Sequence, residues 1–246
     1  VVKSEDENEL DELISSISKF SNTQSRVSSV DLRSRNPQLQ KLKKLSDSVA
    51  TPSGRKWFFE RAKGEFRTKM RMAGSQRKAH EKRFPSNIRF TKEQLAKYYT
   101  AWGAQPFLVK KGGEKVFRYF IEAISSDVED GGNVEIDRTF YEELIAKIIL
   151  FRSMEKIYGQ GKNAIGQIRA AAIPYAISCI FITFDGKAGG KKFNLLKIWK
   201  DEDLKEDLRI YLKNLLILMN DLIKSYSISE DYGEYSKKPE LWNAIS

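Results

Sequence analysis

Apolar residues recur at helical spacing along most of this 246-residue chain, and this periodicity constrains its fold more than any other feature. The best example lies between Leu204 and Tyr226, where apolar or aromatic side chains return every third or fourth residue. That interval places them on one face of an α-helix, which can be buried against a core. We therefore predict a mainly α, multi-helical fold of about eight to ten helices. A few short strands are expected near the N-terminus, at Val1 and Trp57.

Several helix boundaries can be predicted from local signals. Asn36 followed by Pro37 is typical of an N-cap with proline at the first helical position. Thr91 with Gln94 three residues later matches a capping box. The apolar run 170–184 is ambiguous, because its alanines favour a helix while its later β-branched and aromatic residues favour a strand. We predict a helix there, kinked or started near Pro174.

The clearest candidate linker is the segment Asp130-Gly131-Gly132. It divides the chain into residues 1–129, which contain a strongly basic segment, and a helical part at 133–246. Such a linker predicts two subdomains, although one continuous domain is also consistent with a chain of this length.

The composition excludes several classes of protein. A single cysteine, Cys179, rules out an internal disulfide framework and favours a reducing cytoplasm. A single histidine, His80, argues against a zinc site, so we expect neither a metal nor another cofactor. The longest apolar run, 170–184, is too short to span a bilayer, and no membrane partner is expected. The sequence does not indicate an oligomeric state.

The excess positive charge is concentrated in one stretch. Residues 55–83 contain eleven Lys or Arg and three Glu, a net of +8 out of +10 for the whole chain. A polyanion such as nucleic acid is the partner that such a stretch suggests, because each phosphate contact needs a cation. The alternative is a solvated helix face, with Trp57, Phe58 and Phe59 in the core. The candidate nucleic-acid-binding residues are Arg55, Lys56, Arg61, Lys63, Arg67 and Lys69.

A second candidate surface is polar. Asn22 and Gln24 carry amides that can donate and accept hydrogen bonds, and Asp31 follows them. Capping and loop bracing would explain the same residues, with Asn22 ending one helix and Asp31 beginning the next. We predict that the three residues lie together on a surface that a preceding part of the protein completes.

A nuclease centre would need an Asp and then an acidic-x-Lys motif on a neighbouring strand, to hold a divalent metal. Asp185 is followed 18 residues later by the triplet Asp203-Leu204-Lys205. The pattern of the second segment predicts a helix that Asp203 opens, where a strand is required. We therefore assign no catalytic residues to this chain.

Blocks of sequence in a fixed order resemble the AIPR (abortive-infection phage-resistance) family. They are S-N-T-Q-S-R-V at 21–27, W-F-F-E-R-A-K-G at 57–64, and F-T-K-E-Q-L-A-K-Y at 90–98, with V-K-K-G at 109–112. The resemblance implies the carboxy-terminal, helical part of a bacterial phage-defence protein. It also implies a restriction-endonuclease-like nuclease region that precedes the segment seen here. We expect the missing amino-terminal half of the protein to be a partner of this chain.

Three interpretations of the function follow. The first is a module that contacts nucleic acid or regulates the upstream nuclease region. The alternative is a protein–protein interaction or sensor module without nucleic-acid contact. A cryptic nuclease built partly from this chain is a third interpretation. Clustered basic residues would favour the first, an exposed apolar patch the second, and convergent carboxylates with a lysine the third.

Overall fold

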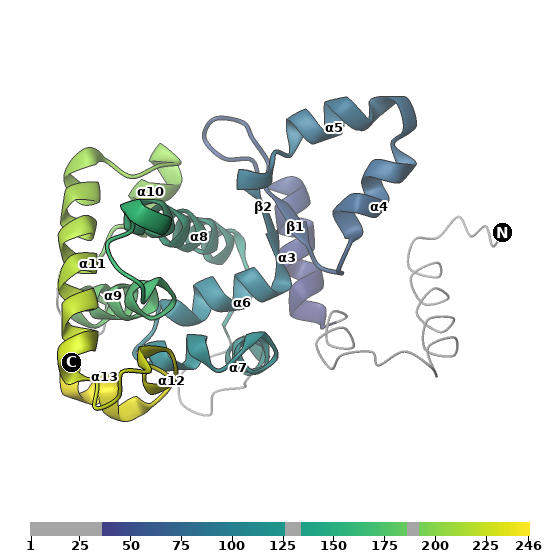
Figure 1. Cartoon of the computed structure of the whole chain (residues 1–246). Helices are drawn as coiled ribbons and strands as arrows, with labels where there is room; N and C mark the ends of the chain where they lie inside the picture. The colour runs from purple at the N-terminus through teal and green to yellow at the C-terminus, as the bar shows by residue number, and fades with distance from the viewer. Residues whose placement is uncertain (1–35, 126–133, 186–191) are drawn as a thin grey trace.

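The structure is a computed structural model that describes residues 36–125, 134–185 and 192–246. The described part is mainly α, as predicted, with two strands of three residues each (Figure 1). Its eleven α-helices exceed the expected number, because short helices follow turns that the periodicity did not separate. The elements are α3 (Pro37–Ser48), β1 (Phe58–Glu60), α4 (Glu65–Met72), α5 (Arg77–Arg83), β2 (Arg89–Thr91), α6 (Lys92–Ala101), α7 (Gly113–Ser125), α8 (Arg138–Tyr158), α9 (Arg169–Phe184), α10 (Leu195–Asp201), α11 (Glu206–Tyr226), α12 (Tyr232–Tyr235) and α13 (Pro239–Ile245).

The two predicted helix starts are confirmed. The side chain of Asn36 accepts a hydrogen bond of 2.8 Å from the backbone N–H of Gln38, with Pro37 at the first position of α3. Thr91 and Gln94 form a reciprocal capping box at the start of α6. Each cap satisfies backbone N–H groups that have no partner inside the helix.

Helix α8 forms the centre of the core. It packs against α6, α9, α10 and α11, which surround it in Figure 1. The ambiguous run 170–184 is a helix, as predicted, with Pro174 inside α9. Every residue from Ala171 to Ser178 is buried. The burial of α9 on all sides therefore explains why this run is a helix, although its local propensities were divided between helix and strand.

Helix α11 differs from its prediction at two points. It begins at Glu206, so Asp203 lies in the turn before the helix and does not open it. The predicted stripe is also only partly buried, because Tyr211 is 48% and Tyr226 is 49% exposed. The phenol ring tolerates water at its hydroxyl end, so tyrosine in an apolar pattern is a weak sign of burial.

Strands β1 and β2 are parallel, with Phe58 opposite Arg89 and Phe59 opposite Phe90. Parallel strands need a long crossover connection, and here α4 and α5 supply it. In Figure 1 these two helices project from the helical body. We call residues 65–83 the basic arm. The strand predicted at Trp57 is thus confirmed one residue later, while that at Val1 lies outside the described residues.

The candidate linker at 130–132 also lies outside the described residues. Buried residues on both sides of it, such as Phe120 on α7 and Leu144 on α8, belong to one hydrophobic core. Helix α6 contacts both α7 and α8. None of the helices in the described ranges combines the length and the hydropathy that a membrane span requires.

Candidate nucleic-acid interface

The aromatic residues of the basic stretch lie in the core. Trp57, Phe58 and Phe59 are 5%, 1% and 0% exposed. Phe58 also contacts the rings of Phe66 and Phe84, with centroids 5.2 and 5.5 Å away, and this cluster supports the base of the arm. The interpretation of Trp57, Phe58 and Phe59 as core residues is confirmed. These rings are not available to stack on bases.

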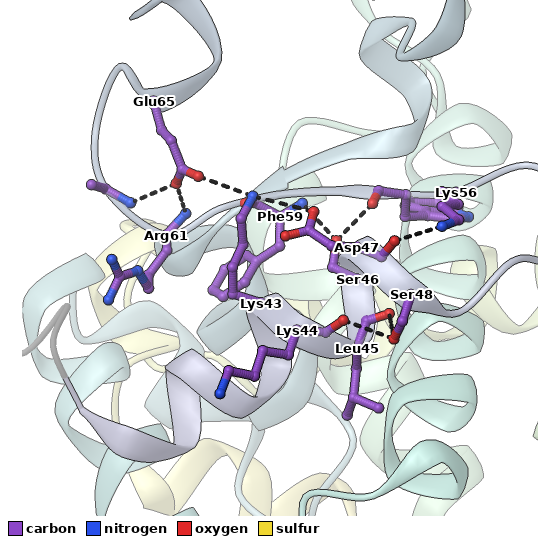
Figure 2. Close-up of polar contacts among 12 residues, drawn as sticks. Lys43, Lys44, Leu45, Ser46, Asp47, Ser48, Lys56, Phe59, Arg61 and Glu65 are labelled. Carbon is purple, nitrogen blue, oxygen red and sulfur yellow. Dashed lines mark hydrogen bonds and ion pairs between the residues drawn. The ribbon is translucent and has the colours of Figure 1, made fainter. Parts of the chain in front are cut away.

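Hydrogen bonds from α3 fix the strand that precedes the arm (Figure 2). The buried hydroxyl of Ser46 donates to the carbonyl of Trp57 at 2.6 Å and accepts from the N–H of Phe59 at 3.0 Å. Lys43 donates through Nζ to the carbonyl of Phe59 at 3.0 Å. Side chains of α3 thereby satisfy the edge of β1 that β2 does not pair.

The three carboxylates of the basic stretch are engaged locally. Glu65 pairs with Lys43 at 2.9 Å and accepts a 2.9 Å hydrogen bond from the backbone N–H of Arg61 (Figure 2). Glu60 accepts from the backbone N–H of Gly64 at 2.7 Å. Glu81 pairs with Arg77 at 3.0 Å. Glu60 and Glu65 therefore hold the backbone at the start of the arm through hydrogen bonds, and Glu81 compensates the charge of Arg77.

The six predicted cations fall into two groups in the sequence, two residues before β1 and four after it. Arg55 pairs with Glu202 at 3.2 Å, and Nζ of Lys56 donates to the carbonyl of Asp47 at 2.6 Å. Arg61 is half-buried and has contacts of its own. The remaining three, Lys63, Arg67 and Lys69, are exposed on or beside α4. Within the described ranges, none of these three has a carboxylate partner.

The arm continues the basic surface beyond the six predicted residues. Helix α5 has no buried residue, and Arg71, Lys78, Lys82 and Arg83 are exposed. A helix that is polar on all sides gains nothing from core burial, so its surface faces solvent or a partner. The charge count of the stretch already included these four residues. The six predicted candidates did not include them.

The polar candidates Asn22, Gln24 and Asp31 lie outside the described residues, so their arrangement stays a prediction.

The acidic residues considered for a nuclease centre are engaged by other groups of the chain. Asp185 ends α9 and accepts a hydrogen bond of 3.1 Å from the N–H of Phe193. Asp203 pairs with Arg209, and it lies with Lys205 in a small cleft of about 130 Å³ beside Asp201 and Asp207. In the described ranges, no three His, Cys, Asp or Glu residues are placed to hold a metal ion together.

The fold and surface together define a mainly helical protein with a small parallel β-α-β element whose crossover is a projecting basic arm. The sequence model of one family, described as AIPR protein, matches residues 1–227, and the chain belongs to this AIPR family. Membership suggests a part in abortive-infection phage defence. No curated protein and no solved structure matches the chain.

Proposed function

We propose that this chain is the nucleic-acid-contacting module of an AIPR phage-defence protein, and that the basic arm is its contact surface. The upstream region of the protein would supply nuclease chemistry, which the module directs or regulates. The observation that carries the proposal is a set of exposed cations on and beside α4 and α5 that form no ion pair with a carboxylate in the described part of the chain: Lys63, Arg67, Lys69, Lys78 and Lys82.

The expected binding is weak, independent of sequence and sensitive to salt. Cations on a convex arm can neutralise phosphates but do not read base edges. A site that uses about four to six phosphates gives a log–log salt slope of about −3 to −5. Non-specific affinity at physiological salt would then lie at roughly 10⁻⁴ to 10⁻⁶ M.

The test compares two triple variants with the same change in net charge. Lys63→Glu, Arg67→Glu and Arg71→Glu reverse three exposed cations on α4 and in the turn just before it; we call this the arm variant. Lys200→Glu, Lys213→Glu and Lys224→Glu reverse exposed cations on α10 and α11. Fluorescence anisotropy with a labelled duplex and a labelled single strand is measured across a salt series.

Loss of binding and a shallower slope are expected for the arm variant only. An equal loss of binding in both variants would mean that the effect comes from the net charge of the chain and not from the arm. Absence of binding by the unmodified chain at low salt would refute the proposal.

An interaction module is the second candidate, and one observation favours it. Ile210, Ile217 and Leu218 on α11 are 55%, 40% and 53% exposed, and their spacing places them on one side of the helix. Exposed apolar side chains grouped in this way are typical of protein contacts. Phage plating on cells that carry the intact defence protein discriminates the two functions. Protection that survives the arm variant and is lost in Ile217→Lys/Leu218→Lys would favour the interaction module.

A further inference from the structure

An open cleft of about 550 Å³ has no residue of the basic arm in its lining. It forms where α6, the last turns of α8 and the start of α9 meet, and the turn Ser86–Ile88 borders it. Arg152, Lys156 and Arg169 all line it. The sequence analysis did not single out these residues, although Arg152 interrupts the apolar run of α8 at 148–151.

The connection from α8 to α9 places Arg169 beside the other two cations. Gly159 ends α8 with φ +77°, and a Cβ there would come within 2.7 Å of the carbonyl oxygen of Asn163. The N–H of Ile165 then donates to the carbonyl of Tyr158 at 2.8 Å, which folds the chain back. Glycine is required at this position for both conformation and space.

Arg152 is held rigidly, but backbone carbonyls hold it instead of a carboxylate. Its two terminal nitrogens donate to the carbonyl oxygens of Asn87 at 2.8 Å and Arg89 at 2.6 Å. A carbonyl dipole orients a guanidinium without cancelling its charge. The fixed guanidinium is therefore a pre-organised positive charge at the wall of the cleft.

Arg169 is incompletely satisfied. Its Nε atom is buried and has no hydrogen-bond partner in the structure. It is the first residue of the 16-residue helix α9, whose N-cap residue Ile168 provides no side-chain cap. A buried donor without an acceptor is costly, so the guanidinium of Arg169 is incompletely satisfied by the protein beside the cleft.

Acidic residues do not neutralise the positive charge of the cleft. One lining residue, Glu155, is acidic, and it pairs with Lys97 at 3.3 Å. Nζ of Lys97 also lies over the ring of Phe151, 4.5 Å from its centroid. In the described part of the chain neither Arg152 nor Arg169 has an ion pair with a carboxylate.

We propose that this cleft binds a mononucleotide, with Arg152, Lys156 and Arg169 on its phosphate groups. Arginine and lysine are the side chains that recognise phosphate best. A phosphate alone fills a small part of about 550 Å³, which is within the range of small-molecule sites. The remaining lining contains Ser86 and Gln160, whose hydroxyl and amide groups suit a sugar and a base. The site does not depend on nucleic-acid binding by the arm.

The test is isothermal titration of the whole chain with ATP, and separately with inorganic triphosphate. Saturable ATP binding is expected, with weaker binding of triphosphate. Arg169→Gln and Lys156→Gln should each weaken ATP binding roughly tenfold, because each removes one charge-assisted hydrogen bond. Arg152 is not replaced, since its hydrogen bonds to two carbonyls also support the fold. Lys162→Gln, exposed in the connecting loop and outside the cleft lining, is the control and should leave affinity unchanged.

Three further measurements make the outcome decisive. Thermal unfolding of each variant excludes a loss of fold. The arm variant Lys63→Glu/Arg67→Glu/Arg71→Glu should bind ATP like the unmodified chain, which separates this proposal from the previous one. Single strands with a 5′-phosphate and with a 5′-hydroxyl are then tested as competitors of ATP.

No ATP binding, or equal effects of Arg169→Gln and Lys162→Gln on ATP affinity, would overturn the proposal. Capture of the 5′-phosphorylated strand without ATP binding would assign the cleft to a strand end instead.

Discussion

The hydroxyl group of Ser46 joins helix α3 to the chain at strand β1. It is 1% exposed and bonds both the carbonyl of Trp57 and the N–H of Phe59 (Figure 2). Both backbone groups lie on the edge of β1 that faces α3. Without the hydroxyl they would be buried without partners, and an unmade buried hydrogen bond costs more than a made one contributes.

We predict that Ser46→Ala lowers the free energy of unfolding by about 1–3 kcal/mol. Ser48→Ala, two residues later on the same helix, is the matched control. Its hydroxyl is exposed and bonds the carbonyl of Lys44 within α3, so its loss should change stability by less than about 0.5 kcal/mol. Urea unfolding followed by circular dichroism measures both. Equal effects would contradict the role given to Ser46.

At the scale of elements, one carboxylate links the turn before β1 to the turn between α10 and α11. Glu202 accepts a 2.7 Å hydrogen bond from the backbone N–H of Ser53 and pairs with Arg55 at 3.2 Å. Burial alone would raise the pKa of Glu202. Hydrogen bonds from Ser53 and Thr51 and the charge of Arg55 outweigh burial, so the pKa is lowered.

A carboxyl group with a lowered folded-state pKa stabilises the fold above its unfolded pKa. That stability is lost as the pH falls through the folded-state pKa. We therefore predict that Glu202→Gln is destabilising near neutral pH, and that its difference from the unmodified chain shrinks below the ordinary pKa of 4.5. Urea midpoints across pH measure this effect. Glu230→Gln, which changes an exposed carboxylate, should show no such trend. A pH-independent difference for Glu202→Gln would remove the electrostatic explanation.

At the scale of the whole molecule, the basic arm, the cleft and the apolar side of α11 occupy different elements around one core. In the described ranges, the carboxylates of the candidate nuclease residues are already engaged, Asp203 by Arg209 and Asp185 by the N–H of Phe193. Metal-dependent hydrolysis needs several oxygen ligands that converge on one ion.

We predict that this chain alone does not cleave plasmid DNA or RNA in the presence of Mg²⁺ or Mn²⁺. Gel electrophoresis after incubation tests the prediction, with Asp203→Ala as the informative variant. Cleavage that co-purifies with the chain and disappears in Asp203→Ala would show that the helical part is itself a nuclease.

The sequence by itself determined the helical class, the caps at Asn36 and Thr91, and the concentration of charge at 55–83. These features depend on spacing, local hydrogen bonds and residue counts, which are properties of short segments. Tertiary structure decided the rest. Packing of α9 on several sides made a helix of an ambiguous run, and Lys43 of α3 paired with Glu65, one of the three acids of the basic stretch. The return of the chain at Gly159 brought Arg152, Lys156 and Arg169 together, because long-range packing sets the separation of residues on different helices.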